Sequence, residues 1–215
     1  MSADMGWILK ALPGIVLGLT VHEFAHAATS HVLGDSTARD DGRMTLNPLK
    51  HIDPWGFLFL IIAGFGWAKP VQINPDAYRN PKRDEILVSL AGPVSNLLLA
   101  FVLMGFLRLF YAEGVFPGTA SDMIRNVLFA AVAVNLGLFV FNLIPIPPLD
   151  GSHLYMVFMR ARFRKAASYF YRYGMGALFI IILIERNAEI DILPILPLIK
   201  GILRFMMSLL AFPGY

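Results

Sequence analysis

The pentapeptide HEFAH, residues 22–26, carries the residue types in this chain that could do chemistry. On a helix, residues four positions apart project from one face, so His22 and His26 could each offer an imidazole nitrogen to one tetrahedral Zn²⁺. Glu23 lies beside them and could act as a general base toward water. The spacing therefore predicts a zinc site with a carboxylate base next to it.

The segment around this motif has the composition of a membrane span. Apolar residues run from Trp7 to about Leu33, with LPGIVLGLTV before the motif and AATSHVLG after it. An ionisable side chain inside a bilayer costs roughly 2–3 kcal/mol on insertion scales, so such residues usually mark function. The alternative is a histidine that only forms a hydrogen bond between helices. That alternative does not account for three polar residues at these offsets.

Composition sets the class of protein. Of the 215 residues, 57% are hydrophobic and 15% charged, and the mean hydropathy is +0.63, which is too apolar for one soluble core and indicates a polytopic membrane protein. The net charge of +3 fits basic cytoplasmic loops rather than nucleic-acid binding. There is no cysteine, so a metal must be held by His and carboxylate. A signal-peptide cleavage after Ala27 would destroy the motif, and we expect none.

Further apolar segments predict an all-α bundle of about five transmembrane helices. They cover about residues 55–67, 86–111, 127–148, 173–184 and 192–212. At 1.5 Å per residue the segments 86–111 and 127–148 can cross a hydrocarbon core, whereas 55–67 is too short. Because prolines flank this short segment, we expect a re-entrant or β-hairpin element between the first two long spans. A short tilted span is the alternative.

Loop charges predict the orientation. Basic residues gather in the stretches 79–83 and 160–172, which two good spans separate, so both stretches are expected in the cytoplasm. The stretch 112–125 is poorer in positive charge and is expected outside. If the segment 55–67 returns to the side on which it starts, the HEFAH helix runs from outside to inside.

A catalytic zinc usually takes three protein ligands, so a third must be found. Asp150 is the best candidate because it ends the apolar run FVFNLIPIPPLDG, where three prolines distort the helix and Gly151 permits a turn. A helix N-cap is the alternative role for Asp150. The other carboxylates outside the first helix fall mostly in charged loops, as do Glu85, Glu113, Glu185 and Glu189.

HEFAH together with NLIPIPPLDG resembles the site-2 protease family of intramembrane zinc metalloproteases, in the short prokaryotic form without a PDZ domain. The segments AGPVSN (91–96) and GWAKPVQINP (66–75) add local matches, and the resemblance covers about residues 15–155. Larger members have a PDZ domain or a helix before the metal-binding one, and we expect neither in this chain. We therefore expect a single domain over residues 1–215, with a core of about 7–155 and C-terminal helices of about 166–212.

The resemblance implies a role for each matching residue. It makes Glu23 the base, and it makes His22, His26 and Asp150 the ligands of one Zn²⁺ per chain. It also places Asn96 and Asn142 at family positions that line the active site. An amide in an apolar helix must find partners, and it could stabilise an oxyanion or simply join two helices. The remaining histidines, His31, His51 and His153, are expected to be bystanders, although His153 could be a fourth ligand or could support the ligands.

These features predict a zinc endopeptidase that hydrolyses peptide bonds within or near transmembrane segments. It would be a multi-pass protein of a prokaryotic cytoplasmic membrane, with its active site toward the cytoplasm. Its partners would be a transmembrane protein or peptide substrate and the lipid bilayer, with no nucleic acid, and a homo-oligomer is compatible with the pattern. An extended segment, 43–50 or 66–75, could hold the substrate as an added β-strand.

Two other functions fit part of the pattern. A membrane proton or metal transporter could use the same His, Glu and Asp side chains as a relay. Such a relay does not require a glutamate directly after the first ligand. A zinc protease of the Ste24 type would need a glutamate as third ligand, and the chain has no suitable glutamate motif.

Overall fold

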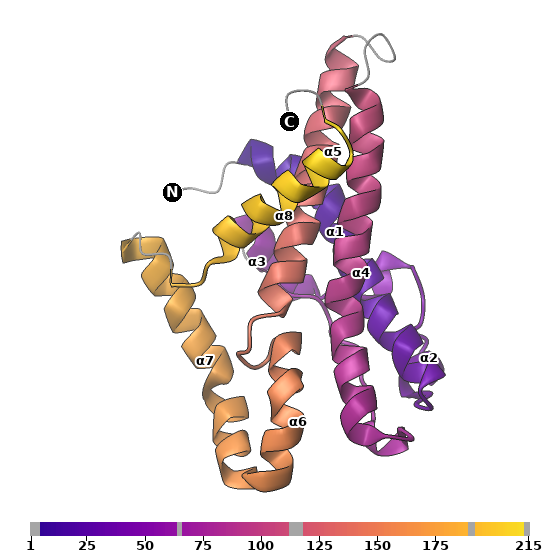
Figure 1. Cartoon of the computed structure of the whole chain (residues 1–215), viewed down its shortest axis with the longest axis vertical. Helices are drawn as coiled ribbons and strands as arrows, with labels where there is room; N and C mark the ends of the chain where they lie inside the picture. The colour runs from indigo at the N-terminus through magenta and orange to yellow at the C-terminus, as the bar shows by residue number, and fades with distance from the viewer. Residues whose placement is uncertain (1–4, 64–65, 112–117, 189–191, 213–215) are drawn as a thin grey trace.

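The computed structural model describes residues 5–63, 66–111, 118–188 and 192–212, and within these ranges the chain is helical, with a single β-bridge and no β-strand (Figure 1). The helices are α1 (Met5–Val32), α2 (Thr37–Asp40), η1 (Pro48–Lys50), α3 (Pro54–Ala63), η2 (Pro75–Ala77), α4 (Pro81–Phe110), α5 (Thr119–Asn142), η3 (Asp150–Ser152), α6 (His153–Arg162), α7 (Arg164–Ala188) and α8 (Ile195–Leu209). The predicted all-α class is confirmed.

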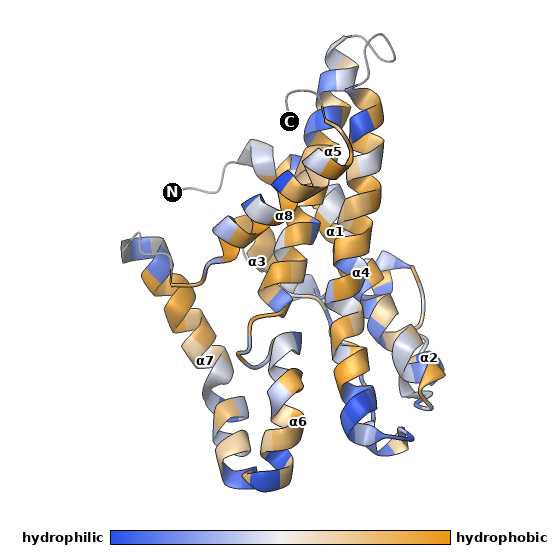
Figure 2. Ribbon diagram, viewed as in Figure 1, coloured by the Kyte–Doolittle hydropathy of each residue, from blue (hydrophilic) through white to orange (hydrophobic). Residues whose placement is uncertain are grey.

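Four described helices are long and apolar enough to cross a membrane. These spans are Gly6–Val32, Pro81–Phe110, Thr119–Asn142 and Arg164–Glu185. The predicted count of about five is not confirmed, because α8 has only 15 residues and runs obliquely across the upper part of the molecule, beside α5 (Figure 1). Figure 2 shows the apolar residues concentrated along the middle of the long helices and the hydrophilic residues near their ends.

Helices α1, α4 and α5 pack against one another and form the frame of the molecule. Small residues let them approach closely: a Cβ added at Gly14 of α1 would lie 2.4 Å from the Cα of Ala131 on α5. Side chains of α4, α5 and the C-terminal segment form the buried apolar cluster, which comprises Ala100, Met104, Leu107, Val132, Leu136, Met206 and Phe212.

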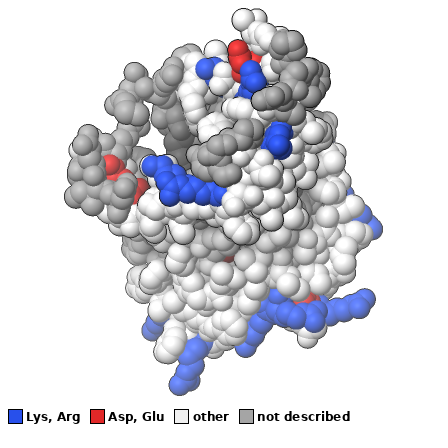
Figure 3. All heavy atoms as spheres, turned by 45° about the horizontal axis from the view of Figure 1, so that its top comes forward, with Lys and Arg blue, Asp and Glu red and all other residues white. Residues whose placement is uncertain are grey.

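The two basic stretches lie at the same end of the molecule. The start of α4 and the junction between α6 and α7 form its lower end in Figure 2, whereas α4 ends and α5 begins at the upper end. Lys and Arg side chains gather along the lower rim of the face in Figure 3, with a band of uncharged surface above them. Residues 118–125 of the stretch expected outside lie at the upper end, and residues 112–117 lie outside the described ranges.

The segment between α1 and α4 leaves the helical bundle and returns to it at one place. The Ser30 and Tyr78 hydroxyls lie 2.7 Å apart, and the backbone N–H of Asn74 donates to Asp35 at 2.7 Å. Around α3, Ile52 and Ala68 form the single antiparallel bridge. The predicted β-hairpin is not confirmed: a ten-residue helix with apolar side chains exposed, such as Trp55 and Ile62, occupies most of this excursion. Residues 64–65 of the predicted segment 55–67 are outside the described ranges.

Candidate metal centre

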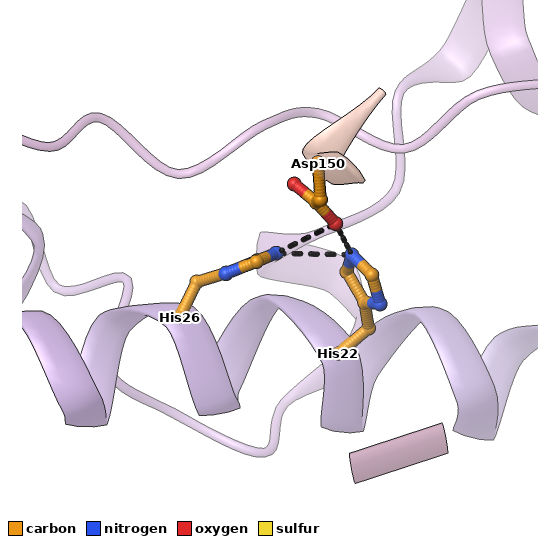
Figure 4. Close-up of side chains that lie close together, drawn as sticks. All are labelled: His22, His26 and Asp150. Atoms are coloured by element: carbon orange, nitrogen blue, oxygen red, sulfur yellow. Dashed lines mark hydrogen bonds and ion pairs between the residues drawn. The ribbon is translucent and has the colours of Figure 1, made fainter. Parts of the chain in front are cut away.

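His22 and His26 lie one turn apart on α1 and project from the same face toward Asp150 (Figure 4). Both histidines are buried, as is Glu23 between them. Their Nε2 atoms are 3.0 Å apart, and the ring planes are nearly perpendicular, at 84°. The predicted shared helical face is therefore present, with two ring nitrogens aimed at one point.

Hydrogen bonds from α4 determine which ring nitrogen carries the proton. The Nδ1 of His26 is 2.7 Å from the backbone oxygen of Val88, which can only accept. The Nδ1 of His22 is 2.7 Å from Oδ1 of Asn96. The amide orientation of Asn96 follows from its Nδ2, which donates to the Gly18 carbonyl at 3.0 Å. Both protons therefore lie on Nδ1, and both Nε2 lone pairs are free to bind a metal.

Asp150 reaches the histidines because the chain stops being helical after α5. The turns that follow Asn142 contain Pro145, Pro147 and Pro148, and η3 begins at Asp150 itself. A Cβ at Gly151 would lie 2.3 Å from the carbonyl oxygen of Leu143, so only glycine fits this close return of the backbone. The N-cap positions of η3 and α6 are held by Leu149 and Ser152 rather than by Asp150, so the alternative N-cap role is not seen here.

The three ligand atoms form a compact triangle. Oδ2 of Asp150 is 3.1 Å from Nε2 of His22 and 3.3 Å from Nε2 of His26 (Figure 4). Ligands about 2.0–2.2 Å from a tetrahedral zinc ion are about 3.3–3.5 Å apart, close to these values. Among the described residues, only this trio forms a group of three or more His, Cys, Asp or Glu close enough to hold one metal ion.

The surroundings also fit a metal ion. Oδ2 of Asp150 is buried and has no hydrogen-bond donor among the described residues. Three lone-pair acceptors facing one another without a proton repel each other unless a cation lies between them. On α4, a Cβ at Gly92 would lie 2.4 Å from Nε2 of His26 and 2.7 Å from Nε2 of His22. Glycine at this position therefore keeps open the space in which an ion would sit.

Glu23 is oriented by a backbone group from the segment between η1 and α4. Its Oε2 accepts a hydrogen bond from the N–H of Val71 at 2.9 Å. Its other carboxylate oxygen has no hydrogen-bond partner in the described part of the chain. One oxygen of the carboxylate is thus held in place while the other can exchange a proton with water.

The two predicted amides lie in different surroundings. Asn96 uses Nδ2 toward Gly18 and toward Oδ1 of Asn135, both at 3.0 Å, so its observed bonds hold His22 rather than point to a substrate carbonyl. Asn142 donates to the Leu138 carbonyl of its own helix at 3.0 Å and is not part of the metal-binding trio. An oxyanion role for either amide stays a prediction.

Of the remaining histidines, His153 has a specific partner. Its Nδ1 is 2.8 Å from Oε1 of Glu85, which Arg160 also contacts at 3.0 Å. This pairing ties α6, which begins directly after η3, to the start of α4. His31 lies 3.4 Å from the Ser36 hydroxyl, and His51 lies 2.8 Å from the Thr45 carbonyl, so neither joins the trio.

Sequence reasoning missed Gly92, Asn135, Val71 and the partnership of Glu85. A usable signal existed for two of them: Gly92 lies in the AGPVSN segment, and Asn135 is an amide inside the apolar run of residues 127–141. The contact from Val71 is made by its backbone, so its side chain carries no signal.

Comparison with known proteins identifies the class. The profile of peptidase family M50 matches residues 112–184, a range that contains Asp150 and begins after HEFAH. YwhC of Bacillus subtilis (strain 168), which has a provisional zinc metalloprotease name, is 41% identical over 178 residues, or 79% of this chain and 81% of YwhC. Rip2 of Mycolicibacterium smegmatis, named in the same way, is 34% identical over 155 residues, or 68% of this chain and 56% of Rip2. No solved structure matches the chain.

Apolar membrane-length helices around a His–His–Asp cluster define a membrane metalloprotease. The similarity to YwhC over most of both chains, together with the profile match, shows that the chain belongs to peptidase family M50, the site-2 protease family. The resemblance seen in the sequence is thus confirmed, and the protein is a zinc metalloendopeptidase. The alternative transporter function gains no support from the family or the relatives.

Proposed function

We propose that His22, His26 and Asp150 bind one Zn²⁺ per chain and that Glu23 is the general base for hydrolysis of peptide bonds within or near transmembrane segments. The observation that carries this proposal is the convergence of three ligand atoms, 3.0–3.3 Å apart, among apolar helices. A polar cluster at such a place is costly unless it binds an ion.

Bound zinc would polarise the scissile carbonyl and lower the pKa of water at the site. Glu23 would take a proton from that water through the oxygen that is not bonded to Val71, and would later pass it to the leaving amide nitrogen. The bond from the Val71 N–H limits rotation of the Glu23 carboxylate, so the base would be positioned before substrate arrives.

A substrate must present its peptide bond in an extended form, because a helical bond is shielded within the helix. The segment that follows Val71 supports this: in the described part of the chain, the backbone groups of Gln72 and Ile73 have no hydrogen-bond partner. Unpaired backbone groups beside the base could pair with a substrate strand. This segment is part of the stretch 66–75 considered in the sequence.

We further propose that the chain is a multi-pass protein of a prokaryotic cytoplasmic membrane, with the end that carries the stretches 79–83 and 160–172 in the cytoplasm. The excess of Lys and Arg at this end supports the orientation. The α3 excursion would be re-entrant, because the bridge between Ile52 and Ala68 returns the chain to its starting point. The active site would then lie toward the cytoplasm.

The test is cleavage of a transmembrane peptide by purified protein in lipid nanodiscs. Glu23→Gln keeps the size of the side chain and removes the base, so we expect full zinc content with cleavage lowered by at least about a hundredfold. Asp76→Asn, which removes an exposed carboxylate at η2, is the matched control and should cleave normally. An active Glu23→Gln protein would contradict the proposed mechanism.

A further inference from the structure

A cavity of about 1080 Å³ opens between the start of α4 and the α6–α7 hairpin. The start of α4 and the α6–α7 junction, which contribute its lining, lie at the end of the molecule where the basic stretches gather (Figure 2). Three arginines contributed by two helices line it: Arg160 from α6, and Arg164 and Arg172 from α7. The cavity is separate from the metal-binding trio, none of whose members lines it.

The cavity has an excess of positive charge. Its single carboxylate, Glu85, is buried and already contacts both His153 and Arg160. Arg164 and Arg172 are exposed and have no carboxylate partner among the described residues. Three arginines against one glutamate leave a net charge of +2 from the Arg and Glu side chains of the lining. Two guanidinium groups are thus available to an incoming anion.

Two chain segments that line the cavity also contribute to the candidate active site. Ile73 lines the cavity and lies two residues after Val71, whose N–H holds Glu23. His153 lines it three residues after Asp150. A peptide paired with the extended segment beside Glu23 would therefore have one part at the metal site and its next residues at this cavity.

We propose that the cavity receives the cytoplasmic flank of the substrate and selects flanks that carry acidic residues; this inference rests on the proposed function. Ordinary membrane helices carry Lys and Arg at their cytoplasmic ends. Such flanks are repelled by Arg164 and Arg172, whereas Asp or Glu forms charge-assisted hydrogen bonds with them. The cavity thus repels the basic flanks of most membrane helices and accepts the minority with acidic flanks. It therefore supplies substrate specificity.

An anionic lipid headgroup offers the same chemistry as an acidic flank. The continuity of the cavity with the segment beside Glu23 favours a peptide as the occupant. The experiment separates these two sources by varying the peptide and the lipid independently.

Two transmembrane peptides that differ only in a Glu-Glu or Lys-Lys pair at the cytoplasmic flank are compared in zwitterionic nanodiscs. Wild type should cleave the acidic peptide about three- to tenfold faster, as expected for two partly exposed ion pairs. The preference should shrink at high salt.

The double variant Arg164→Glu/Arg172→Glu should prefer the basic peptide. Lys165→Glu is the matched control, since Lys165 is next to Arg164 but does not line the cavity, and it should keep the wild-type preference.

The outcomes separate the inference from the proposed function. Equal cleavage of both peptides by wild type overturns the inference and leaves the proposed function intact. Cleavage of neither peptide contradicts the proposed function, and the inference with it. A preference that appears only with anionic lipid, or a double variant that changes lipid dependence but not peptide preference, assigns the cavity to lipid and also overturns the inference. The wild-type comparison needs no variant, so it holds even if the double variant does not fold.

Discussion

Single residues in this protein control where protons are held at the metal centre. His26 is fixed by a backbone carbonyl, which can only accept, whereas His22 depends on the amide of Asn96. An amide can be turned end for end, and its NH₂ group would then face His22. Asn135, fully buried on α5, opposes that turn because its Oδ1 accepts from Nδ2 of Asn96. Asn135 on α5 thus orients Asn96 on α4, and Asn96 in turn orients the ligand His22 on α1.

This series of hydrogen bonds predicts how Asn135 variants bind zinc. Asn135→Leu removes the acceptor for Asn96 and should weaken zinc binding about tenfold, the lower end for groups that support ligands. Asn135→Asp keeps an oxygen at the same place and should bind zinc more tightly than the leucine variant. Competition with a zinc chelator measures both affinities. Equal losses in the two variants would mean that Asn135 only fills space between the helices.

Gly92 offers a second prediction at this scale. Gly92→Ala would place a methyl group within 2.4–2.7 Å of both ligand nitrogens, so zinc binding and cleavage should be lost while the helices still fold. Gly105→Ala is the matched control, because Gly105 is on the same helix and a Cβ there meets nothing within 4 Å. Zinc content by atomic absorption and helicity by circular dichroism are the two measurements. Full zinc content in Gly92→Ala would contradict the location of the site.

The sequence predicted the ligand candidates but not the residues that support them. HEFAH has a helical spacing that brings its own members together, and Asp150 stood out among carboxylates because prolines and a glycine surround it. Asn135 and Gly92 act across helices, and periodicity identifies a helix face without naming the neighbour that it meets. The partner of His153 was missed for the same reason, since Glu85 is 68 positions away.

At the scale of elements, the end of α1 is attached to the segment before α4 through Asp35. This side chain is almost fully buried, at 1% exposure, and accepts hydrogen bonds from Ser30, Thr37 and Asn74. Burial acts to raise the pKa of Asp35, but these hydrogen bonds outweigh it and lower the pKa below its ordinary value. The carboxylate thus stabilises the point where the α3 excursion begins and ends.

The direction of this shift determines how stability depends on pH. Because the pKa of Asp35 is lower in the folded chain, its contribution is present above the unfolded pKa of about 4 and is lost as the pH falls through the folded pKa. Asp35→Asn should therefore lower stability by about 1–3 kcal/mol at pH 7, and the deficit should shrink below about pH 4. Thermal unfolding in detergent measures this, with the exposed Asp40→Asn as control. A deficit independent of pH would contradict the role of the Asp35 charge.

Element boundaries followed the apolar pattern only in part. The apolar segment 173–184 covers only the second half of α7, which begins at Arg164, close to the start near 166 expected for the C-terminal helices. The residues before 173 include no glycine or proline and have good helix propensity, so the helix continues through charged side chains that hydropathy excludes. In the segment 192–212, α8 stops at 15 residues, too short to span.

At the scale of the whole molecule, the two segments that carry the candidate ligands lie toward the basic end. Helix α1 ends there, and α6, which follows the Asp150 segment, starts beside α4. This arrangement predicts the outcome of accessibility labelling in a chain that has no native cysteine. Cysteines replacing Lys50 and Asn80 should react from the same side of the membrane, the cytoplasmic one. A cysteine replacing Asp122 should react from the other side. Labelling of Lys50→Cys and Asn80→Cys from opposite sides would refute the re-entrant excursion.

X-ray absorption at the zinc edge of the purified protein tests the central claim most directly, because it counts and identifies the ligands. The account predicts one zinc ion per chain with two imidazole nitrogens at about 2.0–2.1 Å and carboxylate oxygen at about 2.0–2.2 Å. In Asp150→Ala the carboxylate contribution should disappear and the zinc content should fall. A zinc ion bound by three or more imidazoles, or an unchanged spectrum and zinc content in Asp150→Ala, would contradict the assignment of His22, His26 and Asp150 as the metal centre.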